Sequence, residues 1–501
     1  MKQRCEFVGQ DRIIKFTMAI MAGIAFALLL SAPAFADPFD FSTGDIVVSV
    51  EGNGVQGAAS GPYTDNQAAP LSLFEFDPTG VSSATYEGSL VLPQSNSGAN
   101  FAVSGEYGSS SEGTLQLSGN GEFLTIMGYG VNAAAFNADP GAYSPDSTNT
   151  ALGQSGSMTG QGYTAVPRVV ALVDGDGNVD STTALYNVFN ANNPRSAYTV
   201  NGSTIYVSGQ GTSGDNTGGV FIATRGGNSA TSITGNDAGS GASQDTREVQ
   251  IVNGTLYVST DSKSGATNRD YIGTLGTAGT PPTSVANGSN GPTMLTGFGN
   301  TGGTGKWTLT AAQANGINSA GKEINLSPEN YFFASPSVLY VADSGDPKNT
   351  SATNDKTGSS LGDGGLQKWV NSKADGSGTW TLEYTISAGL NLVPNTDADG
   401  TTGLYGLTGE VIGGTVYLYA TNFTLGDLDS TYLYGIADTL SATTDAGESF
   451  TQLAAAPADS NFKGVSFAPT SGTATPEPAS IALLGLGLAA VLLAKRRYLV
   501  M

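Results

Sequence analysis

Two segments in the middle of the chain share a pattern that contains the dipeptide Asn-Gly. The first reads RSAYTVNGSTIYVS over residues 195–208, and the second reads REVQIVNGTLYVS over residues 247–259. Asn-Gly suits a type I′ turn, because both central residues of that turn need a positive φ. The β-branched and aromatic residues on each side suit two paired strands. The pattern therefore predicts a repeated β-hairpin.

Weaker copies of this hairpin recur along the chain, and one apolar anchor residue marks each copy. The anchors lie about 50 to 80 residues apart and are Val47, Leu124, Ile205, Leu256, Leu339, Val416 and Val465. Such spacing suits four-stranded sheets joined by loops of variable length, and helical periodicity is almost absent. We therefore predict an all-β fold over residues 37–470, a seven-bladed β-propeller closed by pairing near Ile46 and Val465. A β-sandwich or a β-helix array is the alternative.

The residue composition excludes several kinds of chemistry. The 501 residues include no histidine and a single cysteine, Cys5, so histidine catalysis, thiol catalysis, intramolecular disulfides and the usual zinc sites are excluded. The formal net charge of −22 argues against binding of nucleic acid, which needs a basic surface. The remaining chemistry belongs to carboxylate, hydroxyl, amide and aromatic side chains.

The N-terminus has the three parts of a secretory signal. Basic residues precede an apolar run over residues 16–30, and Ala34-Phe35-Ala36 supplies small residues at the cleavage positions Ala34 and Ala36. We predict that residues 1–36 are a signal peptide, which the Sec translocon exports and signal peptidase removes. An uncleaved membrane anchor is the alternative.

The C-terminus combines three features in a fixed order. Pro476, Glu477 and Pro478 precede an apolar run over residues 481–494, and a basic end follows, made of Lys495, Arg496 and Arg497. The run predicts a single transmembrane helix, and the basic end predicts that this helix finishes in the cytoplasm. A plain C-terminal anchor is the alternative to a processed signal.

This order resembles the PEP-CTERM sorting signal of Gram-negative bacteria, over about residues 475–501. The resemblance implies that an exosortase, a membrane transpeptidase-like enzyme, cuts at Pro-Glu-Pro within a sorting tail, residues 471–501. It also implies a route from an inner-membrane intermediate to the outer envelope or the extracellular matrix. Segments such as NYFFASPSVLYVAD from Asn330 and FKGVSFAPT from Phe462 resemble uncharacterised PEP-CTERM propeller proteins. That second resemblance implies a fold and a sorting route without an assigned reaction.

One short segment is a candidate metal site. Asp174, Asp176, Asn178 and Asp180 place oxygen side chains at every second position, as in the first half of a calcium loop. The sixth position is Val179 where such a loop needs glycine, and a polar turn between strands is the alternative. A looser acidic set contains Asp343, Asp346, Asp355 and Asp363. Calcium is the one cofactor that these patterns allow, and otherwise we expect none.

The arginines Arg195 and Arg247 occupy the same place in the two best hairpins. They either form part of a basic ring that holds an anionic ligand in the central channel, or bond to neighbouring blades. The tryptophans Trp307, Trp369 and Trp380 and the 20 tyrosines have faces that stack on sugar rings. The tyrosines repeat beside the anchors, however, which favours core packing.

We expect an exported, surface-sorted and non-catalytic propeller that binds extracellular matrix polysaccharide or protein. The alternative is a carboxylate- or calcium-dependent hydrolase or lyase that acts on extracellular polymer, because paired carboxylates need no histidine. No spacing in the sequence singles out such a pair. Carboxylates that converge in the central channel would favour the hydrolase, whereas a channel of backbone, serine, threonine and asparagine would favour the binding protein.

Overall fold

The structure is a computed structural model of the chain. It describes residues 39–53, 63–212, 214–234, 245–262, 269–285, 291–298, 306–308, 323–345, 364–393 and 399–471. The predicted signal peptide lies outside these residues, with Ala34 and Ala36. So does the sorting tail beyond Ser471, with Pro476, Glu477, Pro478, Lys495, Arg496 and Arg497. Three members of the looser acidic set also lie outside: Asp346, Asp355 and Asp363. Within the described ranges, no helix combines the length and the apolar character that a membrane crossing requires.

Four separate sheets each contain four antiparallel strands that follow one another in the chain. The first is β9 (Pro194–Thr199), β10 (Thr204–Gly209), β11 (Gly219–Thr224) and β12 (Ala230–Ser232). The second is β13 (Thr246–Val252), β14 (Thr255–Ser262), β15 (Arg269–Leu275) and β16 (Thr293–Met294). The third is β19 (Pro328–Ser335), β20 (Val338–Asp343), β21 (Gly365–Asn371) and β22 (Trp380–Ile386). The fourth is β23 (Thr401–Ile412), β24 (Thr415–Thr424), β25 (Tyr432–Thr439) and β26 (Thr451–Ala455).

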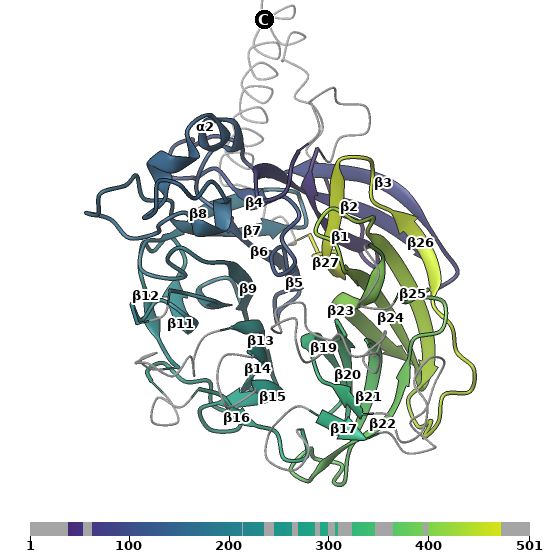
Figure 1. Cartoon of the computed structure of the whole chain (residues 1–501). Coiled ribbons are helices and arrows are strands. Elements are labelled where there is room, and N and C mark those ends of the chain that lie inside the picture. The colour runs from purple at the N-terminus through teal and green to yellow at the C-terminus, as the bar shows by residue number, and fades with distance from the viewer. Residues whose placement is uncertain are drawn as a thin grey trace, which may run out of the picture. The chain divides into compact units, whose positions relative to one another are not determined.

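A nine-stranded sheet contains two more groups of four strands. One group is β27 (Ser460–Phe467), β1 (Ile46–Gly52), β2 (Ala68–Thr79) and β3 (Ser83–Val91), and the other is β5 (Gln116–Leu117), β6 (Phe123–Tyr129), β7 (Arg168–Asp174) and β8 (Val179–Leu185). The short strand β4 (Ser104–Glu106) joins the two groups, and β17 (Lys306–Thr308) pairs separately with β18 (Glu323–Asn325). The groups surround a centre, with β5, β9, β13, β19, β23 and β27 innermost (Figure 1). This is the architecture of a β-propeller.

The described strands make six blades, one fewer than predicted. The seven anchors fall on six blades because Val47 of β1 and Val465 of β27 belong to the same blade. The predicted closure is confirmed, since Ile46 pairs with Phe467 and Val48 pairs with Val465 across antiparallel strands. The last strand of the chain therefore completes the first blade.

The two Asn-Gly hairpins differ. Val252 pairs with Thr255, so the two-residue turn is Asn253 and Gly254, which both have positive φ angles (49° and 77°), as predicted for type I′. In the first copy Ile205 pairs with Thr199, and only Gly202 has a positive φ (80°). The prediction of a type I′ turn is wrong for that copy, because the additional Ser203 lengthens the loop.

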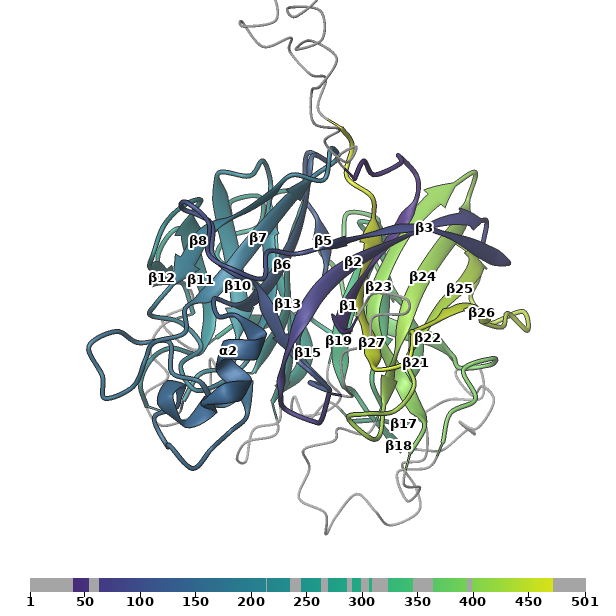
Figure 2. The same cartoon turned by 90° about the horizontal axis from the view of Figure 1, so that it is seen from above.

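The ring has two unlike faces. The described chain begins and ends at one face, where Phe41 N donates to Gly175 O (2.8 Å) and Thr470 N donates to Gly121 O (2.8 Å) (Figure 2). The opposite face carries the β6–β7 connection, with helix α2 (Ala133–Ala138) and the 3₁₀ turns η1 (Pro140–Tyr143) and η2 (Leu152–Gln154). The β24–β25 connection of the last blade occupies the same place in its blade as the β6–β7 connection, so it lies at that opposite face.

Apolar side chains pack between neighbouring blades. Tyr340, Ile386 and Leu418 are fully buried together between the blades of β19–β22 and β23–β26. Trp369 stacks on Phe298 with ring centroids 4.0 Å apart, and Trp380 packs beside them. Two of the three tryptophans thus lie in the core rather than at a ligand surface, and the side chain of Trp307 is not among those described.

Candidate functional site

The predicted calcium residues form the turn between β7 and β8. The carboxylate of Asp174 accepts hydrogen bonds from the backbone N–H groups of Asp176 (3.1 Å) and Asn178 (2.8 Å). Asp180 accepts from Thr182 and forms an ion pair with Arg225 (2.5 Å). Within the described ranges, no group of three or more acidic side chains is placed to hold a metal ion. This arrangement is the polar turn of the alternative reading, and a calcium site here stays a prediction that the geometry does not favour.

Asp343, from the looser acidic set, is fully buried at the end of β20. Its carboxylate accepts from the backbone of Ser327 (2.9 Å) and Gly345 (2.9 Å) and from the side-chain amide of Gln367 (2.9 Å). These bonds make Asp343 a structural acceptor that ties three segments of the chain together.

The repeated arginines bond to neighbouring blades. Arg195 of β9 is 3% exposed and pairs with Asp245, which precedes β13 in the next blade. Arg247 of β13 is 6% exposed and pairs with Asp261 (3.0 Å) and with Glu329 of the following blade (3.1 Å). Both guanidinium groups are therefore occupied by carboxylates of the protein, which supports the structural reading over a ring that binds anions.

Three buried carboxylates meet near the inner strands of the first two blades. They are Glu51 of β1, Glu106 of β4 and Glu112 of the segment that leads to β5. Lys463 of β27 lies 3.7 Å from the carboxylate of Glu51. Burial raises the pKa of Glu51 to about 8, with Glu112 adding to the rise and Lys463 opposing it. Burial also raises the pKa of Glu106 and of Glu112.

Two of these carboxylates already have partners within the protein. Glu112 accepts from the Tyr129 hydroxyl and the Asn193 amide, and its second oxygen accepts from the backbone N–H of Glu106 (3.2 Å). Glu106 accepts from the backbone N–H of Gly153. The centre of the ring thus contains converging carboxylates, which is the arrangement expected of a hydrolase. Glu106 and Glu112 are buried in internal hydrogen bonds, whereas the buried oxygens of Glu51 have Lys463 nearby but no hydrogen-bond partner in the described part of the chain.

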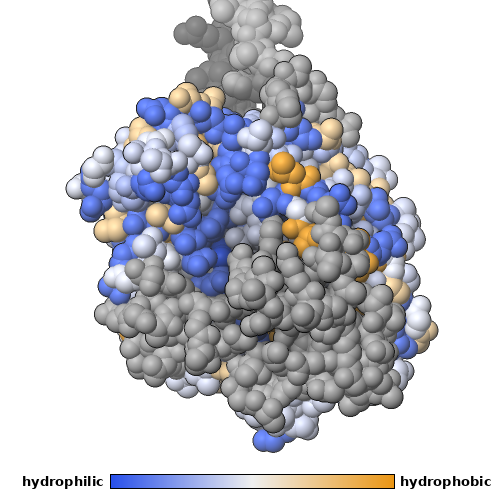
Figure 3. Space-filling view, in the orientation of Figure 1, coloured by the Kyte–Doolittle hydropathy of each residue, from blue (hydrophilic) through white to orange (hydrophobic). Residues whose placement is uncertain are grey.

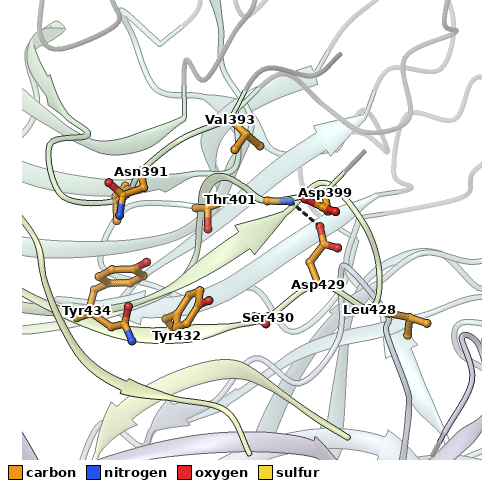
Figure 4. Close-up of a pocket in the computed structure, with 12 residues that line it drawn as sticks. Asn391, Val393, Asp399, Thr401, Leu428, Asp429, Ser430, Tyr432 and Tyr434 are labelled. Atoms are coloured by element: carbon orange, nitrogen blue, oxygen red, sulfur yellow. Dashed lines mark hydrogen bonds between the residues drawn. The ribbon is translucent and has the colours of Figure 1, made fainter. Parts of the chain in front are cut away.

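A cavity of about 480 Å³ opens in the blade of β23–β26. Its walls come from the ends of strands and from the two connections that follow β22 and β24 (Figure 4). Tyr432 and Tyr434 of β25 line it with ring centroids 6.0 Å apart at an angle of 68°. We call this cavity the β25 pocket, after the strand that supplies both tyrosines.

Polar groups surround the tyrosines. The polar side chains of Asn391, Asp399, Asp429 and Gln452 line the β25 pocket, and among the described residues that line it none is a lysine or an arginine. The Asp429 carboxylate is held in place because one oxygen accepts from the backbone N–H groups of Gly400 (2.9 Å) and Gly426 (2.7 Å) (Figure 4). The other lining polar side chains named here have no hydrogen-bond partner in the described part of the chain. They remain available to a ligand.

Sequence reasoning did not single out this pocket. The repeat of tyrosines beside the anchors favoured core packing over a ligand surface. Tyr432 and Tyr434 are two residues apart, so they project from the same face of β25. That spacing was the available signal, but the walls come from three separate segments, residues 390–401, residues 428–434 and Gln452, and only the fold brings them together.

The C-terminal residues 474–497 match the family model of the PEP-CTERM protein-sorting motif. The chain is therefore an exported protein that passes through a membrane-anchored sorting intermediate and is processed by an exosortase. Among curated proteins, none matches the sequence of this chain.

Three solved structures illustrate the weak similarity at the level of the fold. A hypothetical selenium-binding protein from Sulfolobus tokodaii is 10% identical, with 86% of this chain and 96% of that chain covered and a TM-score of 0.37. The GH74 xyloglucanase from Xanthomonas campestris is 10% identical, with 78% of this chain but only 44% of that chain covered and a TM-score of 0.31. A GH43 endo-arabinanase from Bacillus licheniformis is 16% identical, with 52% of this chain and 79% of that chain covered and a TM-score of 0.28. The propeller assignment rests on the strand topology.

Proposed function

We propose that the protein is a non-catalytic, surface-sorted propeller that binds an extracellular polymer through the β25 pocket. The observation that carries this proposal is the contrast in polar partners. The pocket offers aromatic faces and free amide groups to a ligand, whereas the carboxylates at the ring centre are buried. Pockets of about 300–1,000 Å³ with a few polar groups are typical of ligand sites.

The position of the pocket suits a protein whose C-terminal end is processed at a membrane during sorting. The β24–β25 connection lies on the face opposite to the one where the described chain ends at Ser471. The described surface in the orientation of Figure 1 is mostly hydrophilic (Figure 3). A ligand therefore approaches the pocket from the side away from the tail. The outer envelope or the extracellular matrix is the proposed final location.

Binding is tested with purified residues 37–470, which contain every described strand. We expect retention of polysaccharide or matrix protein on an array, and no product in a panel of hydrolase and lyase substrates with and without calcium. Turnover of any polymer would contradict the non-catalytic proposal.

The sorting route is tested by changing Pro476, Glu477 and Pro478 to alanine. The variant should stay in the inner membrane with its tail, because the exosortase no longer recognises the site, whereas the unchanged protein should lose a C-terminal epitope tag. Alanine substitutions at residues 471–473 serve as the control, and they should leave processing intact. A tag that persists on the mature surface protein would show that the tail is only an anchor.

A hydrolase is the second candidate, and the raised pKa values of Glu51, Glu106 and Glu112 favour it. A carboxyl group with a raised pKa can act as a general acid near neutral pH. The test is Glu112→Gln in any preparation that shows turnover. Loss of that turnover with an unchanged melting temperature would support the hydrolase, whereas unaltered turnover would exclude this carboxylate.

A further inference from the structure

We infer that the ligand of the β25 pocket is an uncharged sugar unit of an extracellular polysaccharide. This inference rests on the proposed binding function and adds the chemical class of the ligand. It follows from the charge of the pocket, from the placement of its tyrosines and from the hydrogen-bonding groups around them.

The charge of the pocket excludes acidic ligands. Asp399 and Asp429 line it, and the part of its wall that the structure describes contains no basic side chain. The whole chain also carries a formal net charge of −22. A uronic acid, a phosphate or a sulfate would meet like charges without a partner for its own charge, and such an arrangement opposes binding.

The tyrosines offer the apolar surface that a sugar ring needs. Tyr432 is half-buried and Tyr434 is buried beneath, where its ring also packs against Phe450 with centroids 6.1 Å apart. Packing thereby fixes Tyr434, and the neighbouring Tyr432 is the more exposed of the two rings (Figure 4). Leu428, which is 52% exposed, extends the apolar wall at the rim. Aromatic faces beside polar groups suit a ligand with both C–H and O–H surfaces.

The polar groups favour hydroxyls over a cation. Asn391 and Gln452 each supply an amide that both donates and accepts, as sugar hydroxyls do. The charge of Asp429 is already partly compensated by two backbone N–H groups, so its remaining acceptor capacity suits a hydroxyl donor. Two amides, the carboxylates of Asp399 and Asp429 and an aromatic face form the expected contacts of a neutral sugar, whose hydroxyls donate to both carboxylates.

The experiment compares neutral, acidic and amine-bearing oligosaccharides on the unchanged propeller, residues 37–470, at low and high salt. We expect binding to neutral oligosaccharides with little dependence on salt, because no charge pair forms. Tyr432→Ala should weaken this binding about tenfold through loss of the aromatic face. Tyr432→Phe keeps that face and should bind within about threefold of the unchanged protein.

Two further variants separate the pocket from general effects on the fold. Gln452→Ala removes an exposed amide of the pocket and should also weaken binding. Tyr86→Ala removes an exposed tyrosine on β3 in another blade, and it should bind like the unchanged protein. Melting temperatures of all variants are measured in parallel, and Gln452→Ala decides the question if Tyr432→Ala does not fold.

The outcomes distinguish this inference from the proposed function. If only acidic or amine-bearing ligands bind and the pocket variants weaken that binding, the sugar class is wrong and the binding function stands. If neutral sugars bind equally to every variant, the pocket is not their site and the inference is overturned. If the unchanged protein retains no polymer at all, the proposed function itself fails.

Discussion

The centre of the ring and the β25 pocket are both rich in polar side chains, but they differ in where their hydrogen bonds go. In the centre, Arg247 pairs with Asp261 and Glu329, and all three side chains are buried. In the pocket, Asn391 and Gln452 have no partner within the described ranges. Buried polar groups must be satisfied internally for the fold to be stable, whereas open and unpartnered groups are available to ligands.

Under the proposed function, the ion pairs of the centre stabilise the fold and the pocket binds the ligand. Changes that break the ion pairs of the centre should therefore lower the free energy of unfolding, and changes in the pocket should lower affinity with little effect on the fold.

The largest effect should follow from removal of β27. A chain that ends at residue 458 loses the strand that pairs with β1 and closes the ring. We expect loss of the cooperative thermal transition, because β1 then exposes an unpaired edge. Circular dichroism melting checks this, with a chain that ends at residue 470 as the control. An unchanged melting temperature would contradict ring closure by β27.

The second effect concerns Arg247→Met. The substitution leaves the carboxylates of Asp261 and Glu329 buried without a cation, which should cost about 3–5 kcal/mol in the free energy of unfolding. Arg225→Met, which breaks an exposed pair with Asp180, should cost no more than about 1 kcal/mol. Urea denaturation measures both.

A double variant sharpens this test. Adding Glu329→Gln to Arg247→Met removes one of the buried charges that the single change leaves unpaired. Part of the lost stability should return, because an unpaired buried charge costs more than an absent pair. Simple additivity of the two single changes would argue that the ion pair is unimportant.

The third effect is the dependence of stability on pH. Glu51 has a pKa raised from its ordinary value of 4.5 to about 8, so the folded protein keeps a proton that the unfolded chain releases between these values. The contribution of Glu51 to the free energy of unfolding is therefore fully present below pH 4.5. It is lost as the pH rises to 8, at up to about 1.4 kcal/mol per pH unit.

Glu51→Gln checks this prediction. The variant should resemble the unchanged protein near pH 5 and should be more stable at pH 8, since a glutamine never ionises. Urea denaturation at both pH values measures the difference, with the exposed Glu122→Gln as the control. Equal stability of the Glu51 variant and the unchanged protein at pH 8 would contradict the raised pKa.

The smallest effect on stability should come from the pocket. Gln452→Ala removes an exposed, unpartnered amide, and the free energy of unfolding should change by less than about 0.5 kcal/mol. The matched change in the core is Gln367→Ala, which removes an amide that bonds Asp343 (2.9 Å) and Trp369 (3.0 Å) and should cost about 2–3 kcal/mol. Similar costs at the two sites would remove the distinction between buried, bonded polar groups and the open polar groups of the pocket.

Local patterns in the sequence were enough to predict strands, closure and sorting. The alternation around Asn253 and Gly254 defines a hairpin because a two-residue turn permits few backbone conformations. The order of Pro476, the apolar run and Lys495 predicts a sorting tail because membrane thickness and charge act on a short contiguous segment. These features depend on residues that are neighbours in the chain.

The blade number, the partners of the buried charges and the β25 pocket depend instead on residues far apart in the chain. Val47 and Val465 share one blade although they look like two copies of the repeat. Arg247 meets Glu329 across a blade boundary, and Asn391 reaches the pocket beside Tyr432 through loops of irregular length. The position of a strand in the ring cannot be predicted from the length of the loop that precedes it. Packing between blades sets that position, and with it which polar groups are satisfied internally and which remain open to a ligand.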